Sequence, residues 1–166
     1  MKKGILLSSV VILLFSVVAL AAPKPDYSGK WKLDFSKCEG VPQGTDQVMT
    51  INQKGDELNI ITKVYPAQDM IASVINDIYA LNGQETKYVA QFRGEPGDGK
   101  RVAKWSNEGW GVEVTEEATI ETKQGAVKLN AMRKWTLAPD GKTITIELTA
   151  KTPQGETKSK RVFVKV

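Results

Sequence analysis

Glu116 and Arg133 are charged residues at positions where the sequence otherwise places apolar side chains. Each lies in a run that alternates between apolar and polar residues, the first over residues 110–122 and the second over residues 127–137. Alternation over this length predicts two antiparallel strands, each with one buried and one solvated face. A buried carboxylate and a buried guanidinium would have to pair, because an isolated buried charge is very costly. The two residues are therefore the first candidates for a functional site.

A short loop at Gln124-Gly125 would join the two strands and set their register. If these two residues form the loop, Glu116 faces Arg133 directly across the hairpin. One interpretation is a structural ion pair, which adds little net stability although removing one partner costs about 3–5 kcal/mol. The other is a polar anchor in an apolar cavity, where the planar fork of Arg133 binds the carboxylate of a lipid-like ligand. The sequence leaves both interpretations open.

Several aromatic residues could line such a cavity beside the charged pair. They are Trp105, Trp110, Trp135, Tyr79 and Tyr88. Each tryptophan also has a purely structural interpretation, because large aromatic side chains are typical of a barrel core.

The residue types present disfavour an enzyme. The chain contains no histidine, which removes the usual general base, the triads built on it and most zinc sites. Its single cysteine, Cys38, cannot form an internal disulfide and has no histidine to activate it. Glu116 and Asp77 could act as paired carboxylates only if the fold brings them together. We therefore expect no enzymatic activity, no cofactor and no metal site.

The N-terminus has the composition of a secretory signal peptide. Two lysines precede an apolar run over residues 5–20, and small residues follow at Ala19-Leu20-Ala21. This order predicts a signal peptide over residues 1–21, cleaved after Ala21, and a short leader over residues 22–26. The mature protein would then be secreted or periplasmic. The alternative is an uncleaved anchor, since the apolar segment is near the ~18 residues that a membrane span requires.

The charge gives little reason to expect a nucleic-acid partner. Cleavage would remove two of the 23 basic residues and none of the 19 acidic ones, so the net charge would fall from +4 to +2. The densest basic run, Lys158 to Arg161, has the composition of a solvated edge of the last strand. We expect a monomer with no nucleic-acid partner and, after cleavage, no stable membrane insertion.

The rest of the chain alternates strand patterns with turn signals at short intervals. Hairpin turns are expected at Lys54-Gly55, at Asn82-Gly83 and at residues 95–99, 107–109, 139–141 and 153–155. The turn at Asn82-Gly83 would pair a strand over residues 73–81 with the strand that follows. The pattern predicts one all-β domain over residues 27–166, an antiparallel up-and-down meander of about eight to ten strands closed into a barrel.

Two details of strand pairing and facing follow from the same pattern. The loop at Lys54-Gly55 would set Ile51 opposite Leu58, so that apolar side chains meet. The last strand is ambiguous, because it could bury Val162 and its even-numbered neighbours or Phe163 and its odd-numbered ones.

The segment from Tyr27 to Leu33, Tyr-Ser-Gly-Lys-Trp-Lys-Leu, resembles the G-x-W first strand of lipocalin-like barrels. Residues 54–58, 135–143 and 162–163 are similar to small secreted bacterial lipocalin-like proteins of unassigned function. The resemblance covers residues 27–166 and implies a calycin-type up-and-down barrel that can hold a ligand cavity. It also implies that Trp31 packs at the barrel end against an arginine from a late strand. Arg161 is the match for that arginine, and Arg133 is a competitor.

These observations lead to one hypothesis and two alternatives. The hypothesis is a non-enzymatic, secreted or periplasmic lipocalin-like barrel that binds a small apolar or amphipathic molecule in its interior. The first alternative is a packed barrel whose loops at Gly40–Thr45 or Gly94–Lys100 bind a protein or an envelope polymer. The second is a small hydrolase or isomerase that uses carboxylates. Cavity volume separates the first two, since a barrel filled by its own tryptophans has no room for a ligand.

Overall fold

The computed structural model describes residues 24–42, 46–65, 73–92, 94–107, 109–123 and 125–166. These residues form ten strands and one short 3-10 helix, η1 (Phe35–Lys37). The strands are β1 (Gly29–Leu33), β2 (Asp46–Lys54), β3 (Glu57–Tyr65), β4 (Ser73–Ala80), β5 (Asn82–Phe92), β6 (Glu95–Trp105), β7 (Gly111–Thr122), β8 (Gly125–Leu137), β9 (Thr143–Thr152) and β10 (Gly155–Lys165). Hydrogen-bonded neighbours follow the order β4-β3-β2-β1-β10-β9-β8-β7-β6-β5, and all are antiparallel. The predicted all-β up-and-down meander is confirmed.

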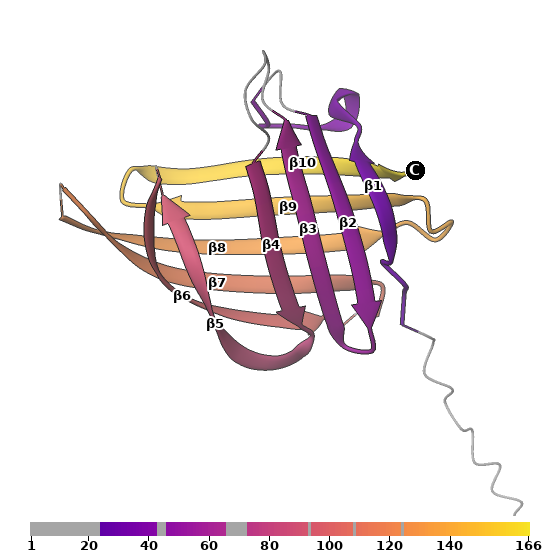
Figure 1. Ribbon diagram of the computed structural model, residues 1–166, viewed down its shortest axis with the longest axis horizontal. Helices are drawn as coiled ribbons and strands as arrows, with labels where there is room; N and C mark the ends of the chain where they lie inside the picture. The colour runs from indigo at the N-terminus through magenta and orange to yellow at the C-terminus, as the bar shows by residue number, and fades with distance from the viewer. Residues whose placement is uncertain (1–23, 43–45, 66–72, 93, 108, 124) are drawn as a thin grey trace, which may run out of the picture.

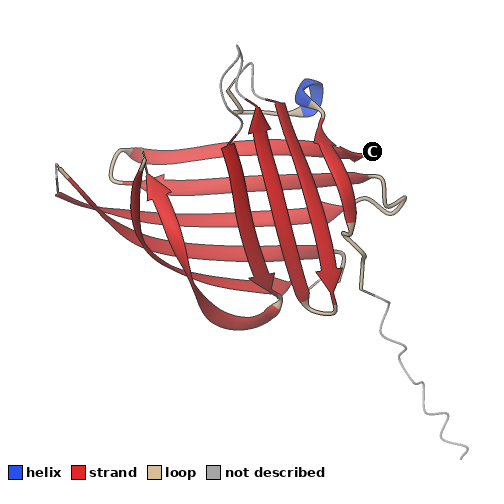
Figure 2. Cartoon of the chain, in the orientation of Figure 1, coloured by secondary structure: helices blue, strands red, loops and turns tan. Residues whose placement is uncertain are grey.

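The sheet bends into a barrel with two crossing layers. β1 to β4 run steeply across the front, and β6 to β10 run behind them in a different direction, while β5 curves between the layers (Figure 1). Strands make up most of the described chain (Figure 2). β1 pairs with β10, with Trp31 opposite Lys165. The barrel is nearly rather than fully closed, because β4 and β5 end the sheet order and share no ladder.

Large inward-facing side chains fill one half of the barrel. They form a cluster around Tyr27, Trp31 and Trp135 that draws on β1 to β4 and on β6 to β10. Burial of each such side chain contributes about 1.5–3 kcal/mol, so this half supplies most of the hydrophobic stabilisation. A smaller cluster in the other half has Ala90, Ala118 and Ile120 as its buried members. The two halves therefore differ in how completely side chains occupy them.

The hairpin of β7 and β8 has a register two residues away from the predicted one. Thr122 pairs with Gly125, and Glu116 lies opposite Ala131 rather than opposite Arg133. The prediction placed Gly125 inside the loop, whereas it is the first residue of β8. A shift of two residues preserves the facing of every side chain. Glu116 and Arg133 thus remain on the inner face, as diagonal neighbours.

The hairpin of β2 and β3 differs from the prediction in the same way. Lys54 pairs with Glu57, so the loop is Gly55-Asp56, and Ile51 faces Ile60 instead of Leu58. Gly55 has a φ of +59°, the left-handed conformation that glycine adopts at no steric cost. The left-handed residue therefore takes the first loop position, and apolar side chains still meet across the hairpin.

The predicted hairpin across Asn82-Gly83 is wrong. Among the described residues, β4 pairs with β3 alone and β5 with β6 alone. Between them the Leu81 N–H donates to the Asp56 carbonyl at 2.6 Å, and the Leu81 side chain is buried. These contacts hold the chain at a corner from which β5 leaves in a new direction. The two strands diverge from this corner instead of forming a ladder (Figure 1).

The predicted loop over residues 95–99 is also wrong, because β6 begins at Glu95 and pairs there with Phe92. Gly97 and Gly99 lie within this strand. A Cβ at Gly97 would lie 2.5 Å from the Ile120 side chain, and one at Gly99 would collide with the Tyr88 ring. The two glycines thus permit close packing inside the barrel rather than a turn. The alternative that placed a binding loop at Gly94–Lys100 loses that loop.

Near its C-terminal end, β10 is buried on both of its faces. Phe163 belongs to the inner core, whereas Val162 points outward and is covered by the segment after β1. The Val162 N–H donates to the Sγ of half-buried Cys38 at 3.4 Å. The odd-numbered residues, Arg161 among them, are therefore the ones that face the interior.

Some predictions fall outside the described residues. These include the signal peptide, the first two residues of the leader, residues 43–45 of the loop at Gly40–Thr45 and residue 108 of the turn at 107–109. In the part of the chain that is described, no helix is long and apolar enough to span a membrane.

Replacing Gly97 with Ala should destabilise the fold, because the new methyl group meets the Ile120 side chain and the Thr119 carbonyl. Overpacking of this kind lowers the free energy of unfolding by about 1–3 kcal/mol. Urea unfolding followed by tryptophan fluorescence measures the loss. Lys100→Ala, on the exposed face of the same strand, is the matched control and should change stability by less than about 0.5 kcal/mol. Equal stabilities of the two variants would contradict the close packing of β6 on β7.

Candidate functional site

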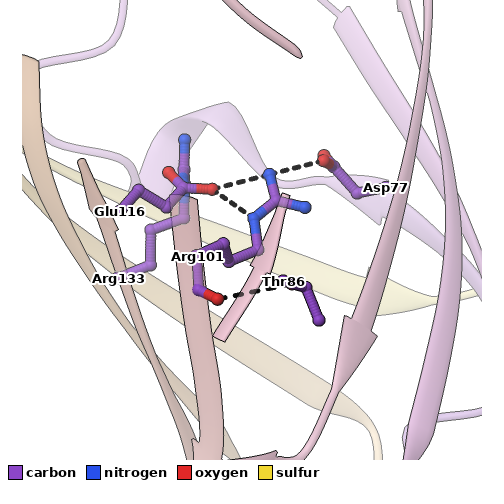
Figure 3. A network of polar contacts seen from close by, with 5 residues as sticks. All are labelled: Asp77, Thr86, Arg101, Glu116 and Arg133. Atoms are coloured by element: carbon purple, nitrogen blue, oxygen red, sulfur yellow. Dashed lines mark hydrogen bonds and ion pairs between the residues drawn. The ribbon is translucent and has the colours of Figure 1, made fainter. Parts of the chain in front are cut away.

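Glu116 and Arg101 form the centre of a buried polar network inside the barrel (Figure 3). Glu116 lies on β7 and Arg101 opposite it on β6, and their side chains are 4% and 5% exposed. Arg101 Nε donates to Glu116 Oε1 at 2.6 Å, and Arg101 Nη2 lies 2.6 Å from the same oxygen. Neither charge reaches water, so each depends on the other for compensation.

Two further charged residues connect this pair to other strands. Asp77, on β4, accepts a hydrogen bond from Arg101 Nη2 at 2.8 Å. Figure 3 shows the Arg101 guanidinium between the carboxylates of Glu116 and Asp77. Arg133, on β8, places Nη1 against Glu116 Oε2 as an ion pair without hydrogen-bond geometry. The pairing of Glu116 with Arg133 therefore exists, but it runs diagonally and belongs to a larger network.

The Arg101 guanidinium lies between two tyrosine rings. Its Cζ is 4.6 Å from the ring centroid of Tyr79 and 4.2 Å from that of Tyr88. A desolvated cation over an aromatic face gains about 2 kcal/mol. Burial raises the pKa of both tyrosine hydroxyls, so both rings stay neutral around the cation. Because Tyr79 is on β4 and Tyr88 on β5, Arg101 contacts both strands of the unpaired boundary.

A cavity of about 570 Å³ adjoins the network. All four charged residues, Asp77, Arg101, Glu116 and Arg133, contribute to its wall. The inward-facing apolar side chains of the wall are Ile75, Ala90, Phe92, Leu129, Ala131, Leu148 and Ala150. The cavity therefore occupies the half of the barrel that the large core residues leave unfilled, and it combines apolar walls with one charged region.

A second hollow, of about 540 Å³, lies against β5 to β8. Most residues around it are exposed and polar, such as Lys87, Lys100 and Glu117, and it touches neither Glu116 nor Arg133. We regard it as a surface depression, and the cavity beside the buried network is the candidate site.

The structure separates the aromatic residues that were expected to line one cavity. Tyr88 does line it. Tyr79 and Trp135 pack against each other in the filled half of the barrel, with ring centroids 5.8 Å apart. Trp105 lies near the β2–β3 turn, where its Nε1 donates to Asp56, and Trp110 is 48% exposed because it precedes β7. This corrects the expectation for all but Tyr88: the four others are not among the wall residues.

Trp31 is fully buried in the core, but the cation over its ring is not an arginine. Lys165 lies opposite Trp31 in the β1–β10 ladder and places its Nζ 5.1 Å from the ring centroid. The Trp31 Nε1 donates to the Tyr27 carbonyl at 3.0 Å. Arg161 lies further along β10, opposite Ile146, which places it deeper in the interior. The expected contact between Trp31 and Arg161 is thus replaced by one with Lys165.

Besides Arg133 Nη1, which forms the ion pair with Glu116, two buried donors have no hydrogen-bond partner in the described part of the chain. They are Trp135 Nε1 and Arg161 Nε. Trp135 on β8 and Arg161 on β10 both pair with Ile146 of β9. This position is two residues along the strands from the wall residues Arg133 and Leu148. Burial, and then repulsion from Arg133, lowers the pKa of the Arg161 guanidinium. Such donors are the complement of an oxygen acceptor.

Arg101 is the central residue that sequence reasoning missed. In β6, Arg101 lies on the same face as Gly99 and Ala103, which are both buried. It is therefore a charged residue on a face of small buried residues, just as Glu116 is a charged residue on an apolar face. Assigning residues 95–99 to a loop concealed this alternation. Asp77 was considered only as a partner for Glu116, and the structure does bring the two carboxylates to one guanidinium.

The arrangement favours binding over proton transfer. Glu116 has both carboxylate oxygens in ion pairs, and Asp77 is bound by Arg101, so neither carboxylate is free to act on a substrate. Among the described residues, no group of three or more His, Cys, Asp and Glu side chains could hold a metal ion. What the site offers is positive charge and N–H donors beside apolar walls.

Solved structures of three proteins are similar to this chain. The zebrafish ileal bile acid-binding protein in complex with cholic acid has a TM-score of 0.50 and 17% identity, over 84% of this chain and 98% of that one. Secretory abundant heat soluble protein 4 from Ramazzottius varieornatus has a TM-score of 0.47 and 16% identity, over 87% and 96%. The fatty-acid-binding protein of Manduca sexta has a TM-score of 0.42 and 13% identity, over 84% and 99%. No family model and no curated protein matches the sequence.

At this level of identity, the likeness to the bile acid-binding protein shows the fold alone. That fold is a nearly closed calycin-like β-barrel, and this chain builds it from ten antiparallel strands. The calycin-type barrel expected from the sequence is therefore confirmed.

Replacing Glu116 with Gln should lower the free energy of unfolding by about 3–5 kcal/mol, because Arg101 and Arg133 lose the counter-charge that they share. Chemical denaturation measures the change. Asp77→Asn is the matched control, since it also removes one carboxylate charge, but at a side chain that is 27% rather than 4% exposed. If Glu116→Gln lost no more stability than Asp77→Asn, Glu116 would not be the centre of the network.

Alkaline pH should destabilise the protein through its buried tyrosines. Burial raises the pKa of Tyr27 to about 12 and raises those of Tyr79 and Tyr88 above the ordinary 10.0. The unfolded chain releases these protons near pH ~10 while the folded chain retains them, so stability falls as the pH rises from about 10 to about 12. The melting temperature should decrease through this window, with a shallower slope in Tyr27→Phe. A melting temperature that stayed constant there would show that the tyrosines ionise equally in both states.

Proposed function

We propose that this protein is a non-enzymatic carrier that binds a small amphipathic molecule with an anionic group inside its barrel. The observation that carries the proposal is the cavity of about 570 Å³, with apolar walls and a charged region that holds two arginines and two carboxylates. Ligand cavities commonly have about 300–1,000 Å³ and combine apolar walls with a few polar groups that orient the ligand. The apolar side chains would contact the body of the ligand, and the arginines its charged end.

The charge balance of the interior supports an anionic ligand. Three inward-facing arginines, Arg101, Arg133 and Arg161, accompany two carboxylates, Asp77 and Glu116. Both carboxylates contact Arg101, and Arg133 contacts Glu116, which leaves Arg161 without an acidic partner among the described ion pairs. A ligand carboxylate would compensate the remaining positive charge. Arginine suits this role because its planar N–H groups can bind a carboxylate in two places.

The buried donors near the cavity support an oxygen acceptor in particular. Trp135 Nε1 and Arg161 Nε are both buried without a hydrogen-bond partner in the described chain. Leaving a buried donor unsatisfied costs about 1–3 kcal/mol, more for a charged group. A carboxylate that reached past Arg133 toward Ile146 would accept from these donors and would lie between Arg133 and Arg161.

The bile acid-binding protein offers an analogy of fold. It was crystallised with cholic acid, an apolar ring system that bears a carboxyl group. A ligand of this general class, an amphipathic carboxylic acid, fits the chemistry of the cavity described above. The analogy adds to the proposal, whereas the residues of the site carry it.

The cavity also bears on the alternatives. A packed barrel that binds a partner through its loops would leave no interior space of this size, and the segment at Gly94–Lys100 is largely strand. A hydrolase that used Glu116 and Asp77 would need at least one carboxylate free of Arg101, and both are bound to it. The carrier is therefore the proposal that the site supports best.

We place this activity outside the cytoplasm. Support comes from the N-terminal sequence, where a basic start, an apolar run and Ala19-Leu20-Ala21 predict export and cleavage after Ala21. The mature carrier would then begin at Ala22 and act as a monomer in the periplasm or outside the cell.

The proposal is tested by comparing a long-chain fatty carboxylate with the fatty alcohol of the same chain, by titration of tryptophan fluorescence. Arg161→Gln should weaken binding of the carboxylate about ten- to a hundredfold, since one charged hydrogen bond is lost. Binding of the alcohol should change little. Lys160→Gln, the outward-facing neighbour, is the control and should bind both as the wild type does. Absence of binding of both probes, together with no small molecule on protein purified gently from its host, would contradict the carrier.

Arg133→Met separates anchoring from structure. Glu116 keeps two contacts from Arg101 in this variant, so the melting temperature should fall only modestly. Carboxylate binding should be lost. A large loss of stability with unchanged affinity would make Arg133 structural.

A further inference from the structure

The wall of the cavity includes residues of both β4 and β5, the two strands that no ladder joins. Its wall includes Asp77 and Ala90, which face inward, and also Asn76 and Gln91, which face outward. Successive side chains of a strand point to opposite faces. At the boundary of these two strands, side chains rather than a backbone ladder therefore form the wall of the cavity. We call this boundary the seam, defined as the gap between β4 (Ser73–Ala80) and β5 (Asn82–Phe92), which no ladder closes.

One hydrogen-bonded ion pair spans the seam. Arg101, from β6 on one side, donates to Asp77 on β4 on the other side at 2.8 Å. The same guanidinium lies against Tyr79 of β4 and Tyr88 of β5. In Figure 3 the Arg101 side chain extends from its own strand toward Asp77 across this space. Arg101 therefore holds together two strands that share no backbone hydrogen bonds.

The two ends of this ion pair are held very differently. Arg101 is 5% exposed, and it donates to Glu116 from Nε and forms an ion pair with it through Nη2, whereas the Asp77 side chain is 27% exposed. If Asp77 separates, its carboxylate can become hydrated while Arg101 keeps a buried counter-charge. Breaking a buried ion pair is costly when it leaves one charge buried and unpaired. Separation of Asp77 from Arg101 leaves no such charge. Arg101 therefore stays in place beside Glu116, whereas Asp77 can separate from it.

We infer that the ligand enters and leaves through the seam, and that the Arg101–Asp77 ion pair is the latch that holds β4 in place across it. The inference rests on the proposed function, because it concerns access to the same cavity. β4 can yield at this edge because its ladder with β3 holds only its other side. Release of Asp77 lowers the barrier to ligand exchange and leaves the groups that bind the ligand in position.

The latch is tested by ligand exchange kinetics with Asp77→Asn. The probe is anilinonaphthalene sulfonate, a fluorescent amphiphilic anion, followed by stopped-flow fluorescence. Association and dissociation should both become faster, by about tenfold, because a gate alters the barrier in both directions. Glu85→Gln, which removes the exposed ion pair with Lys100, is the matched control and should leave both rates unchanged. Unchanged rates in Asp77→Asn, or a change in dissociation alone, would overturn the latch.

The route is tested by closing the seam. Asn76→Cys and Gln91→Cys, in a Cys38→Ser background, are joined by a flexible bis-maleimide that contains a cleavable bond. Joining the two strands should slow both rates by at least about tenfold, and cleaving the linker should restore them. Rates that the cross-link leaves unchanged would show that the ligand uses another route.

Hydrogen exchange of the ligand-free protein examines the latch without any probe. Asp77→Asn should increase exchange of the β4 amides and leave those of β8 and β9 unchanged, and no change in β4 would overturn the latch. Failure of the wild type to bind the probe or the fatty carboxylate would count against the proposed function. Normal binding with rates that neither the Asp77 variant nor the cross-link alters would count against the seam alone.

Discussion

The buried carboxylate of Glu116 is the constraint on which the rest of the interior depends. It is stable there only because Arg101 and Arg133 compensate its charge from the two neighbouring strands. Arg101 must then be accommodated in turn, which Tyr79 and Tyr88 do with their ring faces. Gly99, where a Cβ would collide with the Tyr88 ring, makes room for that arrangement. One acidic residue thus determines which side chains the surrounding strands can carry.

The uneven filling of the barrel separates stability from function. Large side chains such as Trp31 and Trp135 occupy one half, where a substitution would create a cavity in a dense core. In the other half, small residues such as Ala90 and Ala131 line the space beside the charged network. The filled half can supply the hydrophobic stabilisation, so the unfilled half can retain features that lower stability, namely an open edge and buried charge. Departures from ideal packing of this kind concentrate where proteins function.

How far the sequence predicts this structure depends on what its pattern encodes. Alternation encodes which face of the sheet a side chain occupies. The predicted register was wrong by two residues at both hairpins, but a shift of two residues does not change the facing. Glu116 and Arg133 were therefore correctly placed on one inner face. Turn signals are local, whereas the corner at Leu81 arises from tertiary burial and a bond to Asp56, so the Asn82-Gly83 signal misled. The glycines of β6 were interpreted as a turn. Glycine is needed at Gly97 and Gly99 because Ile120 and Tyr88 pack closely against them, and these two residues lie on other strands. Arg101 was missed for that same cause.

The network also explains why an anion could bind here without rearranging the site. In water an arginine must lose hydration and side-chain freedom to bind a carboxylate, and both losses weaken the affinity. Here the ion pair to Glu116 has already oriented Arg133 during folding, although its side chain stays 29% exposed. Arg161 is half-buried, and burial, followed by repulsion from Arg133, lowers the pKa of its guanidinium. An anion between Arg133 and Arg161 would stabilise both positive charges. The free energy that folding spends on placing these charges together would then contribute to the affinity for the ligand.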